Sequence, residues 1–281
     1  MENLFLDPFT ILLIAGFIGF FMAFGIGAND VANSMGPSVG SKAITIKQAI
    51  IIAAIFEFLG AFLAGGEVTS TIRKGIVDPL IYANDINIFI IGMMSALLAG
   101  GTWLYIASLR GWPVSTTHSI VGSIIGFVLI TKGVDAVSWG TVGNIAMSWV
   151  TSPVFSATLA YCLYFSAKKL ILDRSEPEKA AITYIPFYSV FVAAVISLVT
   201  ARKGLKHVGI EWSENEIYLF ILIFSFVVGL LTAFFLRRNK EKIMKDDGIE
   251  YAFGLLMIVS ASAMAFAHGS NDVANAIGPL A

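Results

Sequence analysis

The chain has few charged residues and a single cysteine. Of its 281 residues, 13% are charged and 57% are hydrophobic, and the formal net charge is −1. Soluble domains carry about twice that share of charged residues, so the composition predicts a multi-span membrane protein. The near-zero net charge argues against a nucleic-acid partner, and one thiol, Cys162, excludes an intramolecular disulfide framework.

Basic residues are also missing ahead of the first apolar run. Glu2 and Asp7 precede it, but no Lys or Arg does, and no small-residue cleavage site follows. A secretory signal peptide has both features. We therefore expect the first apolar segment to stay in the protein as a membrane span.

The sequence predicts an all-α polytopic membrane protein. Several apolar segments approach the ~20 residues that a helix needs to cross a bilayer. They are 8–28, 47–65, 86–109, 153–172, 182–200, 217–236 and 250–268. The region 113–150 is apolar but interrupted at 132–135, which leaves pieces at about 115–131 and 138–150. We expect one crossing helix and a short re-entrant piece there, with a re-entrant hairpin as the alternative.

A polar heptapeptide interrupts the first apolar segment and recurs near the end of the chain. The first motif copy is Gly27–Asn33 (GANDVAN), and the second motif copy is Gly269–Asn275 (GSNDVAN). Aligning 24–39 with 266–281 gives nine identities in sixteen positions, which indicates an internal duplication. Polar residues in membrane segments are costly and usually functional. The alternative is a helix-terminating loop with an Asn-Asp cap.

Each motif copy is expected to interrupt its helix. After Gly27 the chain can leave helical geometry, and a new half-helix can begin near Asp30. Such a break exposes carbonyls that suit a cation and N–H groups that suit an anion. Asp30 and Asn33 lie three residues apart on one helix face, as do Asp272 and Asn275.

A second polar cluster, Pro113–His118 (PVSTTH), precedes another apolar run and is called the hydroxyl element here. Pro113 prevents a helix from continuing through it, and Ser115 or Thr116 can cap a helix that starts there. Hydroxyls and free N–H groups at a helix start favour an anion. A plain cap at the membrane surface is the alternative, and His118 has no second His or Cys at metal-ligand spacing.

A carboxylate also lies half-way along a predicted span. Glu57 is in the middle of 50–64, where an unpaired charge costs a few kcal/mol. We expect it to face the protein interior and meet a cation, a proton or a hydrogen-bond donor. A structural hydroxyl partner is the alternative, and His268, which has no counterpart in the first motif copy, receives low weight.

The positions of Lys and Arg favour an N-terminus outside the membrane. With one net crossing in 113–150, this topology places twice as many basic residues inside as outside and inverts the two motif copies. An N-terminus inside the membrane, with no net crossing in 113–150, gives a smaller excess of basic residues inside and parallel copies. Inverted repeats meeting at mid-membrane are common in transporters. We therefore divide the chain into a first repeat (1–172), connecting spans and charged loops (173–248) and the start of a second repeat (249–281).

These motifs resemble those of the PiT family of inorganic phosphate transporters. The family signature resembles GANDVANA and stands here as 27–34 and 269–276, and its Pro-Val-Ser-Thr-Thr-His element stands as 113–118. The family pattern continues with a second Ser-Thr-Thr element and further spans. The resemblance implies an inverted-repeat bundle with broken helices. It also implies symport of phosphate with Na⁺, with protons, or as a metal–phosphate.

When the family's binding residues are placed on the matching motif positions, the resemblance implies two overlapping sets, one for phosphate and one for Na⁺. The phosphate set is Asp30, Asn33, Ser115, Thr116, Thr117, Asp272 and Asn275. The Na⁺ set is Asn29, Asp30, Asn271, Asp272 and Glu57. We expect no enzymatic activity and no cofactor apart from Na⁺ as the coupling ion.

The functional hypothesis is Na⁺-coupled phosphate symport by alternating access in the cell membrane. Two carboxylates and a phosphate repel by several kcal/mol at an effective dielectric of about 20, so cations and phosphate should bind together. The partners expected are inorganic phosphate, Na⁺ or H⁺ and the lipid bilayer, and we also consider a homodimer. One alternative is an inverted-repeat cation exchanger. The other is an intramembrane aspartyl hydrolase in which Asp30 and Asp272 share a proton.

Overall fold

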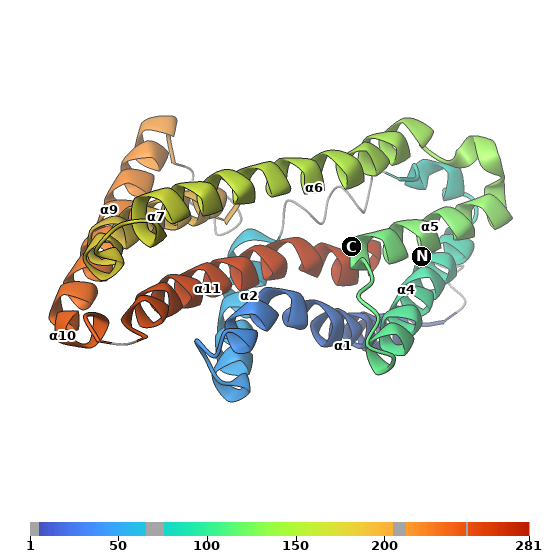
Figure 1. Cartoon of the computed structure of the whole chain (residues 1–281). Helices are drawn as coiled ribbons and strands as arrows, with labels where there is room; N and C mark the ends of the chain where they lie inside the picture. The colour runs from blue at the N-terminus through green and yellow to red at the C-terminus, as the bar shows by residue number, and fades with distance from the viewer. Residues whose placement is uncertain (1–5, 66–75, 205–211, 246, 281) are drawn as a thin grey trace. The chain divides into compact units, whose positions relative to one another are not determined.

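A computed structural model describes residues 6–65, 76–204, 212–245 and 247–280. Within these ranges the chain is built from helices (Figure 1). One isolated antiparallel bridge joins Val77 and Val137 in the described part of the chain. The long helices are α1 (Pro8–Gly40), α2 (Ile46–Ala64), α4 (Ile86–Leu109), α5 (Thr116–Lys132), α6 (Trp139–Ala167), α7 (Pro177–Val199), α9 (Glu214–Arg238) and α11 (Gly248–Ile277). Short 3₁₀, π and α segments join them: η1 (Pro79–Tyr82), η2 (Val134–Ala136), η3 (Lys168–Leu172), η4 (Thr200–Gly204), α10 (Lys240–Ile243) and η5 (Gly278–Leu280).

The helices have the length and composition of membrane spans. In the described ranges, seven helical stretches are long and apolar enough to cross a bilayer, and α5 is a shorter apolar helix of 17 residues. A bilayer requires backbone groups to be hydrogen-bonded within the segment, which helices achieve. The prediction of an all-α, multi-pass membrane protein is therefore confirmed.

The chain divides into two compact units whose residues mainly contact one another. Each unit combines segments that are distant in the sequence. The first unit holds the described parts of 1–34, 57–144 and 268–281, and the second holds those of 35–56 and 145–267. These units describe packing. The predicted division into repeats describes duplication, and it stays a prediction.

In the first unit, α1 packs closely against α4 through glycines. A Cβ on Gly101 would lie 2.9 Å from the Phe21 ring and 3.3 Å from the Met22 backbone, and one on Gly25 would lie 3.3 Å from the Gly101 carbonyl oxygen. Such short separations are available only without side chains, as is common between membrane helices. Met22 on α1 and Leu97 on α4 are fully buried.

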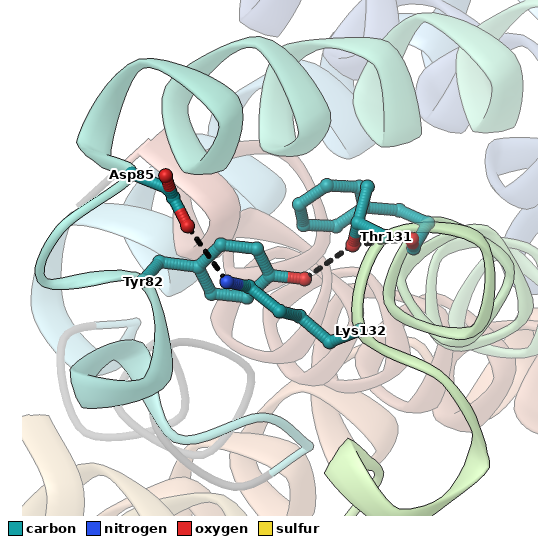
Figure 2. A network of polar contacts seen from close by, with 5 residues as sticks. Tyr82, Asp85, Thr131 and Lys132 are labelled. Carbon is teal, nitrogen blue, oxygen red and sulfur yellow. Dashed lines mark hydrogen bonds and ion pairs between the residues drawn. The ribbon is translucent and has the colours of Figure 1, made fainter.

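The C-terminal end of α5 is held by a polar network (Figure 2). Lys132 forms an ion pair with Asp85 at 2.8 Å, and the Tyr82 hydroxyl lies 2.5 Å from the Thr131 hydroxyl. The Lys132 ammonium also lies 5.0 Å from the centre of the fully buried Tyr82 ring, which stacks on Phe127. These contacts attach α5 to η1 and to the start of α4.

In the second unit, α7 packs against α9. A Cβ on Gly229 would lie 2.4 Å from the Val190 side chain, so a glycine is needed for this approach. The core of the unit is a cluster of side chains with exposures of 0%, comprising Ile171, Ala181, Ile185, Leu236, Ile243 and Ala252. A capping box begins α9, because Ser213 and Glu216 each accept a hydrogen bond from the other's backbone N–H.

The predicted helix breaks at 27–33 and 269–275 are wrong. Helix α1 continues from Pro8 to Gly40, and α11 continues from Gly248 to Ile277. A glycine inside a helix costs about 1 kcal/mol relative to alanine. A break in the bilayer would leave several backbone groups unpaired, at several kcal/mol each. The continuous helix is therefore favoured.

The predicted boundary between a re-entrant piece at 138–150 and a span at 153–172 is also wrong. Helix α6 runs from Trp139 to Ala167 with Pro153 inside it, so the two pieces form one helix. Membrane helices tolerate an internal proline, particularly where hydroxyls contribute local hydrogen bonds. One such bond joins the Thr151 hydroxyl to the Met147 carbonyl at 3.2 Å.

Candidate functional site

The first motif copy lies on α1 and contacts the loop that leads into α5. The Asn29 carboxamide donates to the Trp112 carbonyl at 3.1 Å and accepts from the Val114 N–H at 3.4 Å. The adjacent Asp30 carboxylate accepts a hydrogen bond from the Thr116 hydroxyl at 2.6 Å. Two consecutive α1 side chains therefore bind the loop before α5 and the first residue of α5.

The second motif copy lies on α11 and reaches the same helix start. The buried Asn275 carboxamide lies 3.3 Å from the Thr117 hydroxyl and 3.4 Å from an Asp272 oxygen. Asn271 also lies within 3.4 Å of that Asp272 oxygen. The second copy therefore forms an internal amide–carboxylate cluster with one contact to α5.

The hydroxyl element connects the two motif copies because each of its two threonines contacts a different copy. Ser115 is the N-cap of α5, and its hydroxyl accepts from the His118 N–H at 3.3 Å. The next residue, Thr116, is bound to the first copy, and Thr117 is bound to the second. The N–H groups of Thr116 and Thr117 precede the first intrahelical bond and lie at the positive end of α5. The predicted cap at Ser115 is confirmed.

The two motif copies run antiparallel, as predicted. A Cβ on Gly19 would lie 2.6 Å from the Leu280 side chain and 3.5 Å from the Ala276 carbonyl oxygen. Further along α1, Asp30 lies close enough to interact electrostatically with His268 and Asp272. Residues later in α1 therefore contact residues earlier in α11, so the two helices run antiparallel. Which end of each helix is inside the cell stays a prediction.

Helix α2 brings Glu57 to the site through a close backbone contact with α11. A Cβ on Gly269 would lie 2.0 Å from the Glu57 carbonyl oxygen, a distance that real Cβ atoms do not show. Only glycine fits at this crossing. A Cβ on Gly65 would likewise lie 2.2 Å from the Val273 side chain.

A cavity of about 550 Å³ lies between these helices and contains three carboxyl groups. Asp30, Glu57 and Asp272 line it, and the rest of its wall is apolar. No Lys or Arg is among the described residues that line it. The Glu57 Oε1 atom is buried and has no hydrogen-bond partner in the described part of the chain. The cavity therefore concentrates negative charge without a fixed cation.

Most of the predicted site residues are brought together. Eight of them lie at the start of α5, line the cavity or are hydrogen-bonded to a residue that does. They are Asn29, Asp30, Glu57, Thr116, Thr117, Asn271, Asp272 and Asn275. Asn33 is exposed and lies outside this set, although it shares a helix face with Asp30. Ser115 is exposed and acts as a cap.

Some features of the site were missed by the sequence analysis. The Trp112 carbonyl and the Val114 N–H are backbone groups, and no side-chain pattern marks them. His268 received low weight, yet it interacts electrostatically with Asp30, and its buried Nδ1 has no hydrogen-bond partner among the described residues. Its position directly before the second motif copy was the available signal.

Proteins similar in sequence share one description. A protein of Haemophilus influenzae named "Putative phosphate permease" is 51% identical over 275 residues, covering 95% of this chain and 64% of that protein. The protein of the same name from Helicobacter pylori strain J99 is 40% identical over 271 residues, covering 96% of this chain and 51% of its own length. The chain therefore spans about half to two-thirds of the length of these curated relatives.

A solved structure and a family profile agree with this similarity. The structure described as "The sodium-dependent phosphate transporter" matches with a TM-score of 0.88 and 41% identity, covering 97% of this chain and 66% of that one. The profile of the Phosphate transporter family matches residues 26–281, which include both motif copies and the hydroxyl element. The chain therefore belongs to the phosphate transporter family.

Proposed function

We propose that this protein transports inorganic phosphate across the membrane together with Na⁺. The observation that carries the proposal is the convergence of both motif copies on Thr116 and Thr117 at the start of α5. A helix start with hydroxyls and free N–H groups suits an oxyanion. The names of the relatives and of the matching structure support phosphate as the anion and Na⁺ as the coupling ion.

The charge of the cavity supports coupled binding. Asp30, Glu57 and Asp272 line it without Lys or Arg among the described lining residues. Neighbouring ionised carboxylates in such a cavity repel one another by several kcal/mol at an effective dielectric of about 20. A phosphate near these carboxylates therefore needs cations to neutralise them.

The arrangement of the carboxylates also suggests why the cation needs the anion. Asp30, Glu57 and Asp272 offer carboxylate oxygens to a cation in the cavity. A Na⁺ ion in this cavity would take part of its coordination from phosphate oxygens or water. Each ion then completes the site of the other, which is the physical basis of symport.

Alternating access is the transport mechanism that we propose. The antiparallel motif copies are related by duplication and meet at one cavity. Exchange of the conformations of two inverted repeats opens the same site to the other side of a membrane. This mechanism predicts that one phosphate site serves both sides.

The deciding experiment is uptake of radiolabelled phosphate into liposomes that contain the purified protein. Na⁺ and proton gradients are imposed separately, with Asp272→Asn as the loss-of-site variant. We expect uptake driven by the Na⁺ gradient and none in the variant. Uptake driven only by protons would replace Na⁺ as the coupling ion. Na⁺ flux that ignores phosphate would support the cation exchanger instead.

A further inference from the structure

Asn29 differs from the other amides of the two motif copies in what it binds. Its side chain is 7% exposed, and its carboxamide contacts two backbone groups on either side of Pro113. It donates to the Trp112 carbonyl at 3.1 Å and accepts from the Val114 N–H at 3.4 Å. Asn29 therefore binds the backbone of the loop between α4 and α5.

The loop needs such a partner because it is not helical. Residues 112–115 have no regular secondary structure, and Pro113 has no N–H to contribute. Backbone groups inside a membrane protein must find hydrogen bonds elsewhere when the helix cannot supply them. A carboxamide carries both a donor and an acceptor, so one Asn side chain satisfies a carbonyl and an N–H together.

Two neighbouring α1 residues therefore hold three points of one short segment. Asn29 binds at residues 112 and 114, and Asp30 binds the hydroxyl of Thr116. The segment between these points ends at the helix start that bears the threonines. The position of that helix start relative to α1 consequently depends on Asn29.

The aligned residue in the second motif copy has a different environment. Asn271 is exposed, and its carboxamide lies 3.4 Å from the carboxylate of its neighbour Asp272, with no contact to the loop before α5 among the described residues. Duplication therefore does not explain the Asn29 contacts.

We propose that Asn29 is a positioning residue that fixes the start of α5, so that Thr116 and Thr117 meet the anion in the right place. In this role it does not coordinate the cation. The effect on phosphate rests on the function proposed above, whereas the effect on the loop does not. The two effects can be measured separately.

The first test measures the loop directly. A spin label is attached at His118→Cys, an exposed position in the first turn of α5, in a Cys162→Ala background. Replacing Asn29 by Ala or by Asp should increase the mobility of this label in the electron paramagnetic resonance spectrum. Asn239→Ala is the matched control, because it removes an Asn carboxamide bond to a carbonyl, that of Phe235, outside the site. Unchanged label mobility in both Asn29 variants would overturn the proposal.

The second test separates positioning from cation binding. Asn29→Asp keeps an acceptor for Val114 and adds negative charge, but it loses the donor to the Trp112 carbonyl. Positioning predicts about tenfold weaker binding of inorganic phosphate at saturating Na⁺. A cation ligand would instead keep or improve its Na⁺ affinity on gaining a carboxylate. Unchanged phosphate affinity with tighter Na⁺ binding would therefore overturn the proposal.

A double-mutant comparison completes the design without requiring transport. If Asn29 acts through the hydroxyl element, Asn29→Ala should weaken phosphate binding much less in a Thr116→Val background than in the wild type. Fully additive losses would contradict the proposal. A wild-type protein that binds no phosphate would contradict the proposed function, and the spin-label result would still decide the role of Asn29.

Discussion

The two motif copies share their chemistry but use their amides differently. In the first copy the leading amide, Asn29, is buried against the loop, and the trailing Asn33 is exposed. In the second copy the leading Asn271 is exposed, and the trailing Asn275 is buried against Thr117. Antiparallel helices present opposite ends of the same motif to one helix start. Inversion therefore decides which amide becomes structural.

The glycines that begin the two copies differ in the same way. A Cβ on Gly27 would meet no atom within 4 Å, whereas one on Gly269 would lie 2.0 Å from the Glu57 carbonyl oxygen. Gly27 is tolerated inside a continuous helix, whereas Gly269 is required by the close contact of α11 with α2. The comparison shows that identical residues in a duplication can be under different physical constraints.

The largest effect should come from substituting these glycines. Gly269→Ala places a methyl group against the Glu57 backbone, so α2 and α11 must separate, at a cost of about 1–3 kcal/mol. Gly27→Ala meets no neighbour and should stabilise α1 by up to about 1 kcal/mol. Thermal unfolding of the purified variants in detergent measures both. Equal unfolding temperatures for the two variants would contradict the claim that only Gly269 is required by a helix contact.

Next in size is the effect of the two aspartates on binding. Asp30→Asn and Asp272→Asn keep the side-chain size but remove a negative charge from the cavity. Each should abolish Na⁺-dependent phosphate binding and leave thermal unfolding close to wild type. Asp135→Asn, in η2 outside the cavity, is the control. Wild-type affinity and Na⁺ dependence in both cavity variants would contradict coupling through these carboxylates.

Thr116 and Thr117, which contact different motif copies, should each have an intermediate effect. Thr116→Val removes the donor to Asp30, and Thr117→Val removes the partner of Asn275. Each should cost ~1–3 kcal/mol of phosphate affinity if the hydroxyl faces a buried oxyanion. Binding isotherms of the single and double variants measure this loss. Normal affinity in the double variant would place the phosphate elsewhere.

The smallest effect is expected for the trailing amides of the two copies, of which Asn275 is buried and Asn33 is exposed. Asn275→Ala removes a buried hydrogen bond to Thr117 and should lower stability by about 1 kcal/mol. Asn33→Ala alters an exposed side chain and should change stability by less than about 0.5 kcal/mol. A fine comparison of unfolding temperatures detects the difference. The reverse order would mean that the copies are used alike.

Much of the fold could be predicted from hydropathy and the duplication. Segment lengths predicted the membrane helices, because spanning a bilayer fixes a minimum apolar length. The error at α6 arose because Pro153 and neighbouring hydroxyls look like a boundary in the sequence but remain inside one helix. The error at Gly27 arose because a local preference for a break was weighed without the larger cost of exposing backbone groups to hydrocarbon.

The sequence by itself identified the three carboxylates that line the cavity. Costly residues such as Asp30, Glu57 and Asp272 stand out in apolar segments because the bilayer penalises each of them individually. The tertiary structure alone decided their contacts, including the bonds of Asn29 to the loop and the contact of Gly269 with Glu57. The physical reason is that burial cost acts residue by residue along the chain. Hydrogen bonds and close approaches depend instead on which distant helices meet.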